Sequence, residues 1–579
     1  MDYQQLLTKL LEQSGREREL LKDNKSLADA NFVSILREEA ALVENSDRAW
    51  WAKIQYLLGL VYYYHLEDIE ENYQQAIALF HKALSVFSES DFPVEWATVQ
   101  NYLGNVCRNL DKGKSATKIA SAIAHYQNAL KVRQQDTYPQ LWCSTQYNLG
   151  VTYGMLAEVV EEPDKANYLE EARVSFENFI DFTEPDTEPR WADTKIAVGA
   201  LVQESELGER VENLHYAINC YQSALKVGEA KRDKKVVASA FDYLGHGYRA
   251  LSQYEDRKGN LGRAERAYQN ALSLYDRATQ SYNWAATQND LGTICIVLGK
   301  FQIAIACFKA ALSVFTPNAF PLECTRIGQN LGDLAYKNQL WIEAIEGYER
   351  AIEGVEVSRD RTNSDEQRQA IVKEALDVYS RMVEACIESG TEQHLVKAVE
   401  TVERSRSRYL ADLIASHELD RTDMSQDEKK YLAKYEHIQQ QIDELRSKYE
   451  RKIPPEDNSV ENLFKNTLYI KKKRLGIPPE DIQQLDSWEA EKKQIWRQLR
   501  KSDPVLAGQV RVEPQKFAKL QKLIDSPTTA IVSFYSASNH TYIFILRQSG
   551  ITYHLCPNLS LEKLNEWLQA HYLICLLSC

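Results

Sequence analysis

Apolar and polar residues follow a helical period through the first 340 residues, and one arrangement returns seven times. Each copy centres on a glycine that follows Leu or Val. An apolar residue stands eight positions before the glycine, where five copies have Trp, and another stands three positions after it. Positions separated by seven and four lie on one side of a helix, so each copy predicts an amphipathic helix. The central pairs are Leu58-Gly59, Leu103-Gly104, Leu149-Gly150, Val198-Gly199, Leu244-Gly245, Leu291-Gly292 and Leu331-Gly332.

A second helical pattern follows every glycine. It consists of a small residue, an aromatic residue four positions later and a small or apolar residue beyond it, as in Ala122, Tyr126 and Ala129. Small residues on a helix face allow a second helix to approach closely. A glycine inside a helix costs about 1 kcal/mol relative to Ala, so its return at one register predicts close packing there. The repeating unit is therefore predicted to be a helical hairpin, and the hairpins are predicted to stack as a right-handed solenoid.

The glycine, alanine and aromatic positions resemble the tetratricopeptide repeat (TPR), whose period is about 34 residues. Here the steps between successive glycines are 45, 46, 49, 46, 47 and 40 residues, so the repeats are identified as extended TPRs. The expected fold is mainly α: an N-terminal helical cap at 1–45, a solenoid of seven helical hairpins at 46–356, and further helical pairs at 357–418.

A charged helical arm is predicted at 419–510. Leu432, Ile438 and Ile442 belong to a series of apolar residues at spacings of three and four, which is typical of a coiled coil. Two Ile-Pro-Pro-Glu-Asp breaks precede a returning helix near 485–499, so the arm is expected to form a helical hairpin.

The segment 511–579 is the only β-like part of the chain. Two β-branched and aromatic runs, at 530–535 and 541–546, flank a short polar stretch and predict a β-hairpin. A third run at 551–555 precedes an amphipathic helix expected at 559–573. Since an isolated hairpin is marginal in water, this small α/β segment is expected to be poorly stable or to require a partner.

A more specific resemblance joins these parts. The TPR array is followed by the helix Glu403-Arg404-Ser405-Arg406-Ser407-Arg408-Tyr409-Leu410-Ala411-Asp412-Leu413, the charged arm and the Ala-Ile-Val-x-Phe-Tyr strand. This order resembles the bacterial CHAT proteins, in which TPRs precede a caspase-like cysteine peptidase domain. The resemblance implies that the catalytic His and Cys lie on later strands of the sheet. The chain is therefore expected to be truncated within the CHAT domain, before these residues, and to carry no catalytic residue.

His554 and Cys556 are the one pair that could imitate a catalytic dyad, because alternate residues of a strand share a face. No motif of the family maps to them, and a peptidase also needs an oxyanion site, so they are interpreted as packing residues.

Composition narrows the function classes. The net charge of −14 argues against nucleic-acid binding, and the polar start of the chain and the absence of a long apolar run predict no signal peptide and no membrane association. The protein is accordingly expected to be cytoplasmic. Ten scattered cysteines without a Cys-x-x-Cys pair favour buried free thiols over disulfides or a metal site. No cofactor is expected.

The predicted binding surface is the groove of the solenoid. Positions three before, one after and four after each glycine lie opposite the core stripe, and in TPRs these positions face the groove that binds peptides. The candidate residues are Asn101, Asn105, Arg108, Asp242, His246, Arg249, Asn289 and Thr293. The preferred hypothesis is an interaction scaffold for a protein or peptide, with an inactive CHAT region. The alternative is a TPR-regulated cysteine peptidase whose missing caspase-like segment is supplied by another polypeptide.

Overall fold

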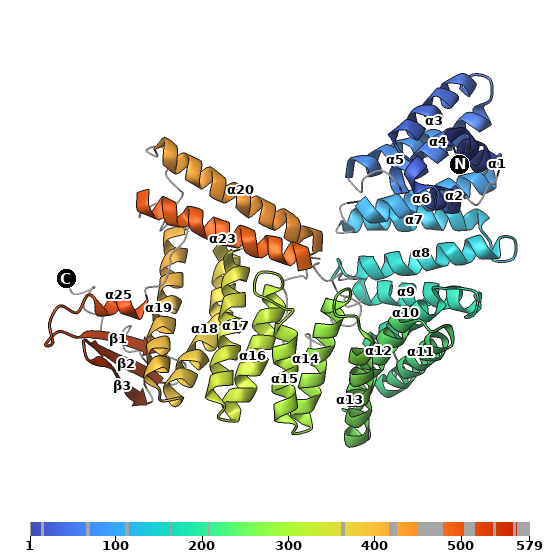
Figure 1. Cartoon of the computed structure of the whole chain (residues 1–579). Helices are drawn as coiled ribbons and strands as arrows, with labels where there is room; N and C mark the ends of the chain where they lie inside the picture. The colour runs from blue at the N-terminus through green and yellow to red at the C-terminus, as the bar shows by residue number, and fades with distance from the viewer. Residues whose placement is uncertain are drawn as a thin grey trace, which may run out of the picture. The chain divides into compact units, whose positions relative to one another are not determined.

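The computed structural model describes residues 2–12, 17–64, 70–110, 115–161, 164–205, 208–360, 365–415, 425–449, 479–502, 516–536 and 540–557, with residues 559 and 563. The chain divides into two compact units, which meet in the sequence between Asn260 and Leu261 (Figure 1). Each unit is described separately. Within the described residues, no helix is both long enough and apolar enough to cross a membrane.

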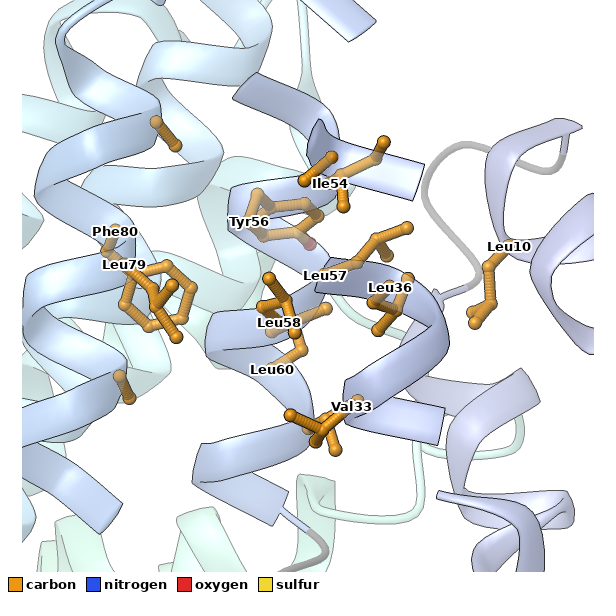
Figure 2. Close-up of a cluster of buried hydrophobic side chains, with 14 of the residues drawn as sticks. Leu10, Val33, Leu36, Ile54, Tyr56, Leu57, Leu58, Leu60, Leu79 and Phe80 are labelled. Carbon is orange, nitrogen blue, oxygen red and sulfur yellow. The ribbon is translucent and has the colours of Figure 1, made fainter. Parts of the chain in front are cut away.

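The first unit begins with three helices, α1 (Tyr3–Glu12), α2 (Glu17–Asp23) and α3 (Ala30–Val43). They pack on the first hairpin through a common apolar cluster that includes Leu10 of α1, and Leu36 of α3 lies beside Leu57 (Figure 2). The first unit then continues as four helical hairpins and a single helix. The helices are α4 (Arg48–Tyr64), α5 (Glu70–Leu84), α6 (Pro93–Asn109), α7 (Ala116–Val132), α8 (Pro139–Ala157), α9 (Asp164–Asp181), α10 (Trp191–Glu204), α11 (Arg210–Lys231) and α12 (Lys234–Leu251).

The second unit completes the repeats. Helix α13 (Arg257–Leu274) crosses the boundary and is followed by α14 (Ser281–Val297), α15 (Phe301–Leu312), α16 (Pro321–Lys337) and α17 (Trp341–Asp360). All seven glycines of the repeat lie inside the first helix of a pair, and every predicted second helix is present. The structure is therefore a TPR-type helical solenoid, which confirms the fold class expected from the sequence.

Close packing explains the repeated glycine. A Cβ atom built on Gly104 would lie 2.6 Å from the Tyr126 ring of the paired helix, and one on Gly150 would lie 2.5 Å from the Phe176 ring. Four other repeat glycines have the same neighbour, at 2.5 to 2.8 Å; the pairs are Gly59 with Phe80, Gly199 with Tyr221, Gly292 with Phe308 and Gly332 with Tyr348. In these six hairpins, an aromatic ring of the second helix occupies the space that a side chain at the glycine position would fill.

Neighbouring hairpins are also joined by hydrogen bonds to a repeated tyrosine. Three residues after the glycine, the Tyr153 hydroxyl accepts from Gln127 Nε2 of the preceding helix at 3.3 Å, and Tyr248 accepts from Gln222 Nε2 at 3.1 Å. At the N-terminal end, Arg37 of α3 makes the equivalent bond to Tyr62, at 2.8 Å. Helix α3 therefore takes the place of a preceding repeat and caps the solenoid.

Helices α18 (Asp365–Glu388) and α19 (Glu392–Ala415) extend the array, as expected. The arm consists of α20 (Gln426–Tyr449) and α23 (Pro479–Ser502), which pack together as a helical hairpin. Its buried residues include Ile442 of α20 and Trp496 of α23. Three further features of the sequence lie outside the described residues: a run of four basic residues, 471–474, the helix expected at 559–573 except for Leu559 and Lys563, and the last two cysteines, Cys575 and Cys579.

The C-terminal segment contains the short helix α25 (Phe517–Gln521) and an antiparallel sheet of β1 (Ile531–Ser536), β2 (His540–Arg547) and β3 (Gly550–Pro557) in the order β1-β2-β3. The register pairs Ser536 with Thr541 and His540 with Pro557. All three predicted strands are present. The segment is not an isolated hairpin, however, which corrects the expectation from the sequence.

One face of the sheet shares a hydrophobic core with α18 and α19. Tyr542 and Phe544 of β2 pack in the same cluster as Val383 of α18 and Val402 of α19. Polar contacts surround this core: the Tyr535 hydroxyl lies 3.2 Å from Ser380 Oγ, and His540 Nε2 lies 3.4 Å from Glu384 Oε1. The sheet is therefore packed as part of the end of the solenoid.

The arginine-rich helix α19 connects these parts. Arg404 forms two hydrogen bonds to the Glu356 carboxylate of α17, at 2.7 and 2.5 Å. Arg406 donates to Ser533 Oγ at 2.9 Å and to the Phe534 carbonyl oxygen of β1. Two arginines of the Glu-Arg-Ser-Arg-Ser-Arg run thus join the last hairpin on one side and the sheet on the other.

Candidate peptide-binding surface

Helix α6 carries the first group of candidate residues, Asn101, Asn105 and Arg108. They occur at spacings of four and three, so they lie along one side of the helix. Asn101 and Asn105 are 6% and 8% exposed, whereas Arg108 is half-buried. The two amides are thus set deep between helices, and the guanidinium is the most accessible group of the three.

The amide of Asn105 is held by the aromatic residue of its own hairpin. The Tyr126 hydroxyl donates to Asn105 Oδ1 at 2.8 Å, while the ring packs on Gly104. Burial raises the pKa of the Tyr126 phenol well above its usual range, so the hydroxyl stays protonated and remains a donor. Since the oxygen of the Asn105 amide is engaged, its Nδ2 group is the remaining donor.

Asn101 belongs to a polar network between α6 and α8. Its Oδ1 accepts from Asn148 Nδ2 at 3.3 Å and also lies 3.3 Å from Thr145 Oγ1. Arg133, just after the end of α7, donates to Thr145 Oγ1 at 3.0 Å and to Thr98 Oγ1 at 3.1 Å. We call the set of Thr98, Asn101, Asn105, Arg108, Arg133, Thr145 and Asn148 the α6–α8 polar surface.

Arg133 is an unusual member of this surface because it is 4% exposed and its guanidinium has only hydroxyl partners among the described residues. Burial lowers the pKa of its guanidinium to about 10, since removal from water disfavours the charged form. The group still carries its proton at neutral pH. Its Nε has no hydrogen-bond partner among the described residues.

Sequence reasoning missed Arg133, Thr98, Thr145 and Asn148. Arg133 follows a second helix, outside the periodic stretch, so no register assigned it to a face. Thr145 and Asn148 lie on the first helix of the next repeat, where their spacing from Gly150 differs from that of the candidate positions. The sequence signal that could have indicated these residues was the presence of polar residues on both α6 and α8.

An aromatic residue lies near the exposed end of this surface. Tyr147 of α8 packs against Phe179, and the Arg190 guanidinium lies 4.7 Å from the centre of its ring. Burial raises the pKa of Tyr147, while the positive charges of Arg190 and Arg108 oppose that rise. Arg108 is thus close enough to Tyr147 to act on it electrostatically.

The second group of candidates lies on α12. Asp242 and His246 are 2% and 1% exposed, and His246 Nε2 lies 3.8 Å from Asp242 Oδ2. Arg249, one turn further along, is half-buried. Two of the three residues are therefore enclosed by packing.

The third group, Asn289 and Thr293, lies on α14 in the second unit. Thr293 Oγ1 donates to the backbone carbonyl of Asn289 at 3.0 Å, so this hydroxyl is used within its own helix. Asn289 is 4% exposed, and its Nδ2 lies 3.4 Å from Asp290 Oδ1. Of the three groups, the one on α6 is joined to a neighbouring hairpin by a described side-chain network.

His554 and Cys556 lie on β3, opposite Ile543 and Thr541 of β2. The imidazole is exposed and the thiol is half-buried. The other seven described cysteines are buried, and all eight are free thiols.

No protein-family model matches this chain, and a search of curated proteins finds no match either. Among solved structures, the chain is similar to the apo form of the quorum sensor NprR from B. thuringiensis, at 13% identity, covering 71% of this chain and 96% of that chain with a TM-score of 0.35. It is similar to a Rap protein complexed with competence and sporulation factor, at 13% identity, covering 71% and 99% with a TM-score of 0.32. The MamA protein is 19% identical, with coverage of 38% and 91% and a TM-score of 0.26. At these scores the likenesses carry no argument about the site, and the TPR-type architecture rests on the packing of the hairpins.

Proposed function

We propose that this protein is an interaction scaffold whose TPR-type solenoid binds a protein or peptide at the α6–α8 polar surface. The observation that carries the proposal is the state of the two asparagines on α6. The oxygen of each amide is engaged within the protein, which leaves the two Nδ2 groups and the Arg108 guanidinium as donors on one side of one helix.

Donors in a row suit an extended peptide. A peptide in this conformation exposes backbone carbonyl oxygens that need partners when they leave water, and amide groups fixed by a second contact lose little freedom on binding them. Arg108 makes no hydrogen bond or ion pair among the described residues, so a ligand would not need to displace an existing partner. The proposed groove residues on α12, in the same unit, would extend such an interaction if the ligand spans several repeats.

For the C-terminal region we propose the inactive, CHAT-like interpretation. A cysteine peptidase needs a thiolate, an adjacent base and an oxyanion site held in an enclosed pocket. On the described strands, His554 and Cys556 lie on the edge strand β3, where the imidazole is exposed and the thiol is half-buried. The alternative, a peptidase completed by a caspase-like segment of another polypeptide, would need both its thiolate and its base from that segment. It predicts peptide cleavage when the segment is added, and the inactive interpretation predicts none.

The scaffold proposal is tested with the full chain and a synthetic library of random nonapeptides. Peptides captured by the immobilised protein are identified by mass spectrometry, and their affinities are measured by fluorescence anisotropy with labelled copies. Asn105→Ala and Arg108→Ala are expected to weaken binding about tenfold each, the loss that corresponds to one or two hydrogen bonds. Asn219→Ala is the matched control, because Asn219 is exposed on the second helix α11. Failure to capture any peptide, or equal losses in all three variants, would overturn the proposal.

A further inference from the structure

The arginines of the α6–α8 polar surface differ from three other partly buried arginines of this chain. Arg173 pairs with Glu170 and Glu177, Arg190 pairs with Glu188, and Arg404 pairs with Glu356. Buried charges in proteins are normally compensated in this way, because an isolated charge is costly to remove from water. Arg108 and Arg133 form no ion pair among the described residues.

Arg133 shows most clearly that this surface has positive charge without a paired carboxylate among the described residues. In the described ranges, its guanidinium donates only to the neutral hydroxyls of Thr98 and Thr145, although the side chain is almost completely enclosed. The surrounding network continues through the neutral amides of Asn101 and Asn148. Within the part of the chain that the structure describes, this surface therefore holds two positive charges without an ion-paired carboxylate, although the net charge of the chain is −14.

The two charges lie toward opposite ends of the surface. Arg133 is anchored at Thr98, and Arg108 lies ten residues further along α6. At 1.5 Å per residue this separation is about 15 Å along the helix axis. An extended peptide covers the same distance in four or five residues.

We infer that the ligand of the α6–α8 polar surface is an acidic peptide, which places carboxylates near Arg108 and Arg133, four or five residues apart. This inference rests on the proposed scaffold function and specifies its ligand. The carboxylate near Arg108 forms a direct ion pair, and the one near Arg133 is attracted through a low-dielectric interior, where a charge acts over a longer distance than in water. The peptide backbone between them accepts from the Asn101 and Asn105 amides.

Two sources of carboxylate fit this chemistry: Asp and Glu side chains, and the C-terminal carboxylate of the peptide. The test therefore uses the nonapeptide library in two forms, one with a free C-terminal carboxylate and one with a C-terminal amide. Each form is presented to the full-length wild-type chain. The measured quantity is the frequency of Asp and Glu at each peptide position, relative to the input library.

Wild-type protein is expected to enrich acidic residues in the amidated library, with pairs four or five positions apart over-represented. Enrichment confined to the library with a free C-terminus would assign one of the two carboxylates to the chain end. Capture of peptides without any acidic preference would overturn this inference and leave the scaffold proposal standing. Capture of no peptide would overturn both.

Arg108→Gln is expected to lower the affinity for the selected acidic peptides at least tenfold. It should leave thermal denaturation of the protein unchanged, because the Arg108 side chain has no partner to lose among the described residues. Arg133→Gln should reduce the acidic preference as well, and its denaturation profile shows whether the network has survived. Lys131→Gln is the matched control, since this exposed residue on α7 carries the same charge two positions from Arg133. If Lys131→Gln lowers the affinity for acidic peptides as much as Arg108→Gln does, the attraction is a general charge effect and the inference is wrong. The salt dependence of binding should likewise decrease in Arg108→Gln and stay unchanged in Lys131→Gln.

Discussion

A single methyl group at Gly104 should distinguish close helix packing from mere helix propensity. A Cβ atom there would lie 2.6 to 2.8 Å from three atoms of the Tyr126 ring. The ring is fully buried, and its hydroxyl is bonded to Asn105, so it cannot move away without a further loss. Overpacking costs about 1–3 kcal/mol, and we expect the upper half of that range. Subtracting about 1 kcal/mol for the better helix propensity of Ala leaves Gly104→Ala about 1–2 kcal/mol less stable.

Gly262 of α13 provides the matched control, because a Cβ atom there would have no neighbour within 4 Å. Gly262→Ala should therefore be more stable than the wild type by up to about 1 kcal/mol. Thermal denaturation compares the two variants. Native-state hydrogen exchange then locates the effect, and amides of α6 and α7 should exchange about 5 to 30 times faster in Gly104→Ala. Equal stability of the two variants would refute the role of the aromatic ring.

Three further predictions concern the second unit. Arg404→Ala should lower the free energy of unfolding by about 2–3 kcal/mol, as measured by thermal denaturation. This loss is smaller than for a fully buried pair because 25% of the Arg404 side chain is exposed. A loss below about 0.5 kcal/mol would contradict the pairing with Glu356. Burial raises the pKa of the Glu384 carboxyl in the folded protein above its value in the unfolded chain. The folded state therefore loses stability relative to the unfolded state as the pH rises through the pKa in the folded protein, because the buried carboxyl must ionise. Glu384→Gln should therefore raise the melting temperature at pH 7 and have little effect below pH ~4, where the carboxyl is protonated in both states; the opposite dependence would show that the His540 contact dominates. Iodoacetamide should label Cys556 in the native protein much faster than Cys386, whose pKa burial raises to about 12, and equal rates in peptide mapping would contradict the packing of α18.

The sequence could predict the hairpins because their signal is periodic and repeated. Gly104 and Tyr126 were placed on facing helices by register alone, and the structure confirms that they touch. The same register put Asn105 beside the groove, but it could not show that Tyr126 would bind its amide oxygen. Periodicity gives the direction of a side chain and says nothing of how deeply neighbouring hairpins enclose it.

Two other features were beyond the reach of periodicity. Arg133 enters the polar surface from the residue after a helix, where no repeat fixes direction. The packing of Phe544 with Val383 joins residues separated by more than 150 positions, and either could have formed the core of an independent module. Such long-range contacts depend on which apolar surfaces remain uncovered once the local elements have formed.

The core shared by the sheet with α18 and α19 has a consequence for engineering. A fusion or domain swap that cut the chain between the arm and β1 would leave Val383 and Val402 uncovered on one fragment and Phe544 on the other. Both fragments would then expose apolar surface, and this choice of cut point would lead to aggregation. A graft that keeps residues 321–415 together with 516–557 would transfer the whole of this cluster, which also includes Tyr348 and Ile352 of α17. The transferable module of this C-terminal part is thus discontinuous in sequence, with the arm as an insertion that could be shortened or replaced.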